Sequence, residues 1–252
     1  MKKLTLTLGV LFAGALLVGG CAKLDTANGL EGKVIATPGP LVVREIPVVN
    51  ADNKETTLDH LIVLVDTSDG LAANGRLRHE QELVDAFAAE MPNGSFDIQV
   101  GAFASNQREL DEYSGVPDET SGYYSLAGYD REGLERAANE KIGEGSAMTL
   151  ARAMHLVSKE IKHNDGNYAL LIFSDGLTFR ERPILKACNE IRASHHGRFC
   201  IYAAQMGDTH RGTDLLEGMV AEAGCGEQYS GAVLSSAPAA MKELVRAVFF
   251  TT

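Results

Sequence analysis

Basic residues are scarce in this chain. Among its 252 residues, Lys and Arg number 23 against 34 Asp and Glu, which gives a formal net charge of −11. Non-specific binding to nucleic acid depends on Lys and Arg at the phosphates, so this deficit argues against a nucleic-acid partner. Hydrophobic residues make up 45% and charged residues 23%. That balance is typical of a folded globular protein, and the length allows one large domain or two small ones.

No charged residue occurs at positions 4–20, a run that is almost wholly apolar or small. The basic stretch MKK precedes this run, and VGGC at positions 18–21 ends it. A basic head, an apolar middle and small residues before a cut are typical of a secretory signal peptide. VGGC resembles the lipobox of bacterial lipoproteins, which implies cleavage before Cys21, acylation of Cys21 and firm anchoring by three acyl chains.

We therefore expect a lipid-anchored protein of the bacterial cell envelope that faces the periplasm. Ala22 follows the lipidated cysteine, where Asp favours inner-membrane retention in enterobacterial lipoproteins, so Ala22 favours the outer membrane. An uncleaved transmembrane anchor is the alternative. The expected organisation is a signal peptide at 1–20, a lipidated tether at 21–56 with one edge strand at 41–49, and a folded domain at 57–252.

Paired cysteine motifs are absent. No Cys-x₂-Cys occurs, which argues against a zinc site built from Cys188, Cys200 and Cys225. An exported chain meets an oxidising compartment, where a disulfide is expected. Cys200 opens an apparent strand and Cys225 lies in the turn AGCGEQY, so we expect a Cys200–Cys225 disulfide. A Cys188–Cys200 bond is the alternative, and either pairing leaves one thiol free.

Strand-like and helix-like segments alternate from about residue 58 onward. Strands are expected at 61–65, 95–104, 168–176, 199–206 and near Tyr229, and helices at 76–91, 131–141, 149–163, 183–193, 211–223 and 239–250. The residues between 105 and 130 are polar and predict a long surface excursion. Alternation with apolar strands predicts an α/β fold, in which helices cover both faces of a doubly wound, mostly parallel sheet.

Two apolar runs end in an acidic residue. LIVLV leads into Asp66, and ALLIFS leads into Asp175. Ligands of doubly wound sheets bind beyond the carboxyl ends of the strands, where strand order reverses, so we expect both carboxylates at one rim. The segment GEGSAMT adds the hydroxyl groups of Ser146 and Thr149. A hard divalent cation prefers such oxygen ligands.

DTSDG, GEGSAMTLARAM and FSDG together resemble the three metal-site loops of von Willebrand factor A (VWA) domains, whose first loop reads Asp-x-Ser-x-Ser. The resemblance covers about Leu58 to the end of the chain. It implies a MIDAS-like site in which Asp66, Ser68, Ser146 and Asp175 hold Mg²⁺, or else Mn²⁺ or Ca²⁺. It also implies a protein partner, such as an envelope protein with an exposed carboxylate that takes an open position on the ion.

Further segments are similar to those of exported lipoproteins that join a VWA domain to an outer-membrane-protein-A-like peptidoglycan-binding domain. These segments are CIYAAQMGD and AGCGEQY. The wall-binding domain has no counterpart in this sequence. By this resemblance, an envelope role would depend on the lipid anchor and the rim.

The first loop departs from the VWA pattern at Gly70, which stands where the second Ser belongs and offers no side-chain ligand. Asp69 lies beside it, so Asp69 and Thr149 are further candidate ligands. The alternative is a structural envelope lipoprotein with a metal-free rim, in which Asp66 and Asp175 accept hydrogen bonds from backbone N–H groups.

A phosphatase-like hydrolase is the remote alternative. DTSDGL superficially resembles the Asp-x-Asp-Gly-Thr motif of haloacid-dehalogenase-like phosphatases, where the first Asp attacks phosphorus and the second acts as general acid. Here Ser68 holds the second position, the next acid is Asp69, and no clear phosphate-binding Lys loop follows. We therefore expect a binding protein and not an enzyme.

Overall fold

The computed structural model describes residues 56–68, 70–71, 74–92, 96–104, 124–126, 131–144, 148–162, 165–178 and 180–250. The strands are β1 (His60–Asp66), β2 (Asp97–Phe103), β3 (Tyr124–Leu126), β4 (Tyr168–Ser174), β5 (Phe199–Gln205) and β6 (Gly226–Ser230). The helices are α2 (Arg76–Glu90), α3 (Arg131–Glu144), α4 (Leu150–Lys162), α5 (Glu181–Ser194), α6 (His210–Ala223), α7 (Gly231–Ser236) and α8 (Pro238–Phe250). The signal peptide, the tether up to residue 55 and the edge strand expected at 41–49 lie outside these residues.

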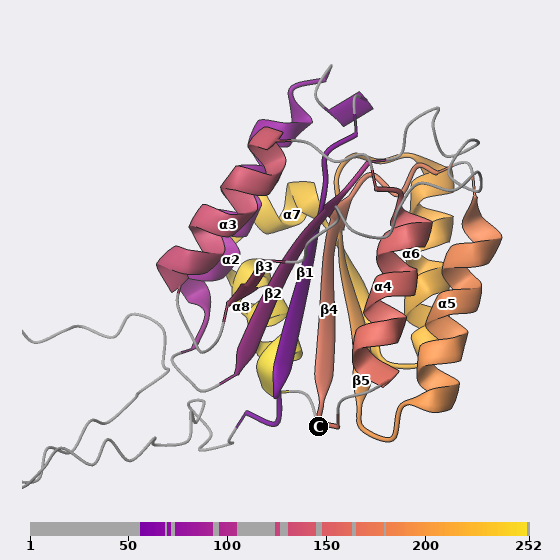
Figure 1. The fold of residues 1–252 in the computed structure, drawn as a ribbon. Helices are drawn as coiled ribbons and strands as arrows, with labels where there is room; N and C mark the ends of the chain where they lie inside the picture. The colour runs from indigo at the N-terminus through magenta and orange to yellow at the C-terminus, as the bar shows by residue number, and fades with distance from the viewer. Residues whose placement is uncertain are drawn as a thin grey trace, which may run out of the picture.

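The strands form one sheet in the order β3-β2-β1-β4-β5-β6 (Figure 1). Every pairing is parallel except that of β2 with β3. The chain passes from β1 to β2 on one side and later continues from β4 to β6 on the other. Strand order therefore reverses between β1 and β4, at the centre of the sheet. The predicted doubly wound α/β fold is confirmed.

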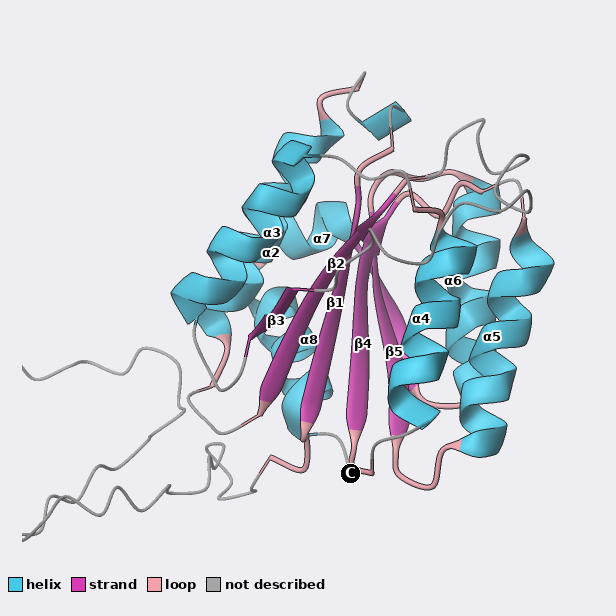
Figure 2. Ribbon diagram, in the orientation of Figure 1, coloured by secondary structure: helices cyan, strands magenta, loops and turns pink. Residues whose placement is uncertain are grey.

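Helices cover both faces of the sheet (Figure 2). α2, α3, α7 and α8 lie on one face, and α4, α5 and α6 lie on the other. β1 and β4 are almost completely buried because they are apolar at successive positions and have a helical layer on each side.

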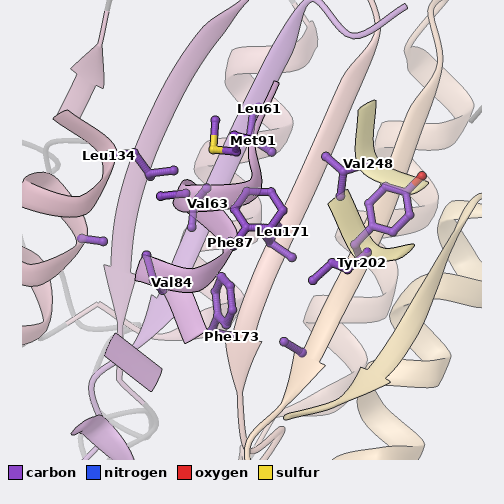
Figure 3. Packing of buried hydrophobic residues seen from close by; sticks show 14 of the residues in the cluster. Leu61, Val63, Val84, Phe87, Met91, Leu134, Leu171, Phe173, Tyr202 and Val248 are labelled. Carbon is purple, nitrogen blue, oxygen red and sulfur yellow. The ribbon is translucent and has the colours of Figure 1, made fainter. Parts of the chain in front are cut away.

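The first core cluster fills the space between the sheet and the layer that contains α2 and α8. Val63 and Leu171 of the strands lie beside Phe87 of α2, and Val248 of α8 lies beside Tyr202 of β5 (Figure 3). Full burial of one such side chain contributes about 1.5–3 kcal/mol. The second cluster lies on the opposite face under α4, α5 and α6. The core is thus split by the sheet into two apolar layers.

Two short elements were not predicted. β3 lies within the stretch expected to be a surface excursion, and pairs with β2 as an antiparallel edge strand. α7 is a single short helix between β6 and α8. The other expected segments match described helices or strands, with their ends shifted by a few residues.

The structure contains the Cys200–Cys225 disulfide, which joins the start of β5 to the turn before β6. Cys188 is the free thiol among the described residues, and it is buried on α5. Burial raises the pKa of the Cys188 thiol to about 12, so this group is an unreactive part of the core. Within the described part of the chain, no helix is both long and apolar enough to cross a membrane.

Candidate functional site

The carboxyl end of β1 carries a buried carboxylate. Asp66 has no exposed surface, and Ser68 is also buried. Asp66 Oδ1 accepts hydrogen bonds from the Ser68 backbone N–H, at 3.0 Å, and from the Ser68 hydroxyl. Asp66 Oδ2 accepts one from the Ser174 hydroxyl at 2.6 Å. The first loop therefore folds back on Asp66 and is joined there to β4.

The carboxyl end of β4 supplies the second acid. Asp175 is buried, and its Oδ1 accepts a hydrogen bond from the Leu177 N–H at 2.9 Å. Gly176 follows with a φ of 71°, and a Cβ there would lie 2.4 Å from the carbonyl oxygen of Gly212 on α6. Only glycine fits this left-handed turn and close approach. The SDG segment thus sets Asp175 against the first turn of α6.

The second loop is described from Met148 onward. The Ala104 N–H, at the end of β2, donates to the Met148 carbonyl at 2.7 Å and holds this loop at the same rim. Thr149 is buried, and its hydroxyl accepts a hydrogen bond from the Arg152 N–H at 3.2 Å. That contact satisfies a donor in the first turn of α4. Asp69 and Ser146 lie outside the described residues.

A third carboxylate, which sequence reasoning missed, lies beside the first loop. Glu80 of α2 has no exposed surface, and its Oε1 accepts the Asp66 backbone N–H at 2.8 Å. Glu80 occupies the helix face that also buries Leu83, Val84 and Phe87. An acid at core-facing helical spacing is the signal that could have identified it, because charged residues are seldom buried without a partner.

Burial shifts the charge balance of this rim. It raises the pKa of Asp66 from 3.8 to about 6, and the nearby Asp175 adds to the shift while hydrogen bonds from Ser174 and Ser68 oppose it. Burial also raises the pKa of Asp175, where the positive charge of Arg76 acts in the opposite direction. The pKa of Glu80 is raised well above its usual value by burial and then by the charge of Asp66. Each acid would gain from a nearby cation.

The donor set fits a hard divalent cation in its chemistry. Carboxylate and hydroxyl oxygens gather where β1 and β4 end, and Glu80 Oε2 is a buried oxygen without a hydrogen-bond partner. No group of three or more His, Cys, Asp or Glu side chains with metal-site geometry occurs among the described residues. A site here would therefore depend on hydroxyl groups as well as acids.

No protein-family model and no curated protein sequence matches this chain. Solved structures do resemble it. The manganese-loaded TRAP protein of Plasmodium vivax aligns with a TM-score of 0.50 and 13% identity, over 75% of this chain and 74% of that one. The pilus adhesin SpaC of Lactobacillus rhamnosus GG, in an open conformation, aligns with a TM-score of 0.50 and 9% identity, over 78% of this chain and 31% of that one.

The VWA domain of SpRpn10 also aligns, with a TM-score of 0.46 and 11% identity, over 75% of this chain and 94% of that domain. At such identities, structural likeness describes the fold alone. With the strand order and the rim described above, the chain has the fold of a VWA domain. The fold expected from the DTSDG and FSDG loops is therefore confirmed.

Proposed function

We propose that this VWA domain binds a protein partner through a divalent cation held at the rim. Asp66, Ser68, Ser146 and Asp175 are the central ligands, with Asp69 and Thr149 as further candidates. Mg²⁺ is the expected ion, and Mn²⁺ or Ca²⁺ would suit the same oxygen donors. The bound cation would supply a positive centre for a carboxylate of the partner.

The distribution of buried polar residues carries this proposal. Among the described residues, the buried polar and charged positions are Asp66, Thr67, Ser68, Glu80, Thr149, Ser174, Asp175, Thr178 and Gln205. They lie at or beside the carboxyl ends of the central strands, whereas the rest of the core is apolar. Burying polar groups costs stability, so their concentration at one rim is best explained by binding.

The described residues have distinct roles in this proposal. Asp66 orients the Ser68 hydroxyl by accepting its hydrogen bond, and the Ser174 hydroxyl fixes the other Asp66 oxygen. Asp175 is held by the Leu177 N–H through one oxygen. These contacts orient the acids before a cation arrives, which reduces the ordering needed on binding.

A lipid on Cys21 would hold the domain at the periplasmic side of the envelope, with the outer membrane favoured by Ala22. The VGGC sequence supports this placement. SpaC is a pilus adhesin, and its likeness to this chain extends to the fold. The partner in our proposal is a protein with an acidic group, since a cation at an acidic rim would attract one.

A metal-free structural lipoprotein is the second candidate, and one observation favours it. Both oxygens of Asp66 already accept hydrogen bonds from Ser68 and Ser174. Gly70 also lacks the hydroxyl of the VWA pattern. In this alternative the rim acids stabilise their own turns, and the partner binds elsewhere.

Calorimetric titration of the purified full-length chain with Mn²⁺ and Mg²⁺ distinguishes these candidates. We expect binding that is lost in Asp66→Asn, because the amide removes the charge while keeping the size of the side chain. Asp214→Asn is the matched control, since Asp214 is an exposed acid on α6. A wild-type chain that gives no heat and no thermal stabilisation at millimolar ion would exclude cation bridging and favour the metal-free rim.

A further inference from the structure

Glu80 is a charged group in an otherwise apolar helix face. On α2, its neighbours at helical spacing are Leu83, Val84 and Phe87, which pack in the first core cluster. The side chain reaches the end of β1, where Oε1 accepts the Asp66 N–H. Its second oxygen, Oε2, is buried and has no hydrogen-bond partner. One carboxylate oxygen is therefore used by the fold and the other is not.

A structural role accounts for only one of the two carboxylate oxygens of Glu80. The Asp66 N–H needs one acceptor, which a neutral glutamine would also provide. A carboxylate adds a negative charge and a second acceptor, both buried, and both costly unless something compensates them. The nearby charges of Asp66 and Asp175 increase this cost because they have the same sign.

The charge has a use if a cation occupies the rim. Gly70 leaves the first loop one hydroxyl short of the VWA pattern, so the site has fewer oxygen donors around the ion. Glu80 lies directly behind Asp66, on the side from which α2 packs on the sheet. A buried carboxylate there would strengthen the attraction of the rim for a divalent ion, because charges interact strongly where water is excluded.

We propose that Glu80 is a charged component of the cation site. It acts from behind Asp66, holding the Asp66 backbone in place and adding negative charge to a rim that lacks the hydroxyl at position 70. This inference rests on the proposed function. It assigns a role to a residue outside the three rim loops, and it explains why an acid stands on a core-facing position of α2.

The test compares Glu80→Gln with the wild-type chain by Mn²⁺ calorimetry and by thermal unfolding in EDTA. Glutamine keeps an oxygen for the Asp66 N–H and removes the charge. We expect Mn²⁺ affinity to fall about tenfold or more, because a divalent ion loses a buried charge nearby. We expect the metal-free melting temperature to stay the same or rise, because repulsion between the acids is relieved. Glu82→Gln, an exposed acid on the same helix, is the control and should change neither quantity.

Each outcome separates the two proposals. If wild-type protein binds Mn²⁺ and Glu80→Gln binds equally well, the role of Glu80 is overturned and the rim site stands. If wild-type protein does not bind Mn²⁺, both proposals fail. A Glu80→Gln chain that melts earlier in EDTA or does not fold would also overturn this inference, because the charge would then serve the fold itself.

Discussion

The two ends of the central sheet differ in how their polar groups are arranged. At the amino end, Asp59 accepts the Asn167 N–H at 2.7 Å, and His60 stacks on Tyr168 with ring centroids 4.3 Å apart. At the carboxyl end, Asp66, Asp175 and Glu80 are buried together, and each has a raised pKa. At the amino end, the polar groups are exposed or half-buried and have partners. The other end keeps buried negative charge, which costs stability and suits a ligand.

If this contrast holds, a substitution at the amino end of the sheet should lower the stability of the fold and leave cation binding at the rim unchanged. Tyr168 is buried, and His195 also contacts its ring, edge to face. We expect Tyr168→Ala to lower the free energy of unfolding by about 3–5 kcal/mol through loss of packing. Urea unfolding measures this change. At a temperature where the variant is folded, its Mn²⁺ affinity should match that of the wild-type chain. A loss of Mn²⁺ affinity would contradict the view that the amino end serves stability and the carboxyl end serves binding.

The pH dependence of stability tests the carboxyl end. A carboxyl whose pKa is higher in the folded chain than in the unfolded chain stabilises the fold while protonated. For Asp66 this contribution is present below pH 3.8 and is lost as the pH rises through about 6. The loss corresponds to about 3 kcal/mol. We expect urea unfolding in EDTA to show the wild-type chain losing this much stability, relative to Asp66→Asn, between pH 3.5 and 7. Parallel profiles for the two chains would contradict the raised pKa.

The smallest effect on stability is expected at position 70. There, adding a hydroxyl group to the carboxyl end of the sheet tests whether that end binds a cation. A Cβ on Gly70 would meet no atom within 4 Å, and its backbone is not in the left-handed region. Gly70→Ser should therefore change the free energy of unfolding by less than about 1 kcal/mol. It restores the hydroxyl of the VWA pattern, so Mn²⁺ affinity should rise. Gly70→Ala is the control, and an equal rise in that variant would exclude the hydroxyl as the cause.

Long apolar or amphipathic segments were predictable from the sequence because their patterns reflect burial. LIVLV and ALLIFS predicted β1 and β4. Because Asp66 and Asp175 come at the ends of these two segments, the sequence also predicted that both acids would lie at the carboxyl end of the sheet. β3 was missed because three residues carry no measurable period, and its conformation depends on pairing with β2. α7 was missed because GAVLSS has few strong helix formers, so its helix depends on its position between β6 and α8.

The candidate site was predicted only in part, because the sequence pattern places residues at strand ends but does not show which helix side chains reach the same rim. Asp66, Ser68 and Asp175 follow strands, so their meeting at one rim follows from a parallel sheet. Glu80 reaches that rim from α2, which packs against one face of the sheet, and no local pattern indicates which strand end its carboxylate contacts. Its spacing from Leu83, Val84 and Phe87 marks an acid at a core position, but its contact with the Asp66 N–H is known only from the structure.

The chain enters and leaves the domain at one end of the sheet. The Thr56 hydroxyl, just before β1, donates to the Phe249 carbonyl near the end of α8 at 2.7 Å, so the described part of the chain begins and ends at the amino end of the sheet (Figure 1). If Cys21 is lipidated as we propose, the tether would join the domain at the end of the sheet opposite the rim. Residues 21–55 could span at most about 120 Å when fully extended. In the proposed arrangement the attachment point and the acidic rim would therefore be at opposite ends of the domain, so that the tether would leave the rim accessible to a partner.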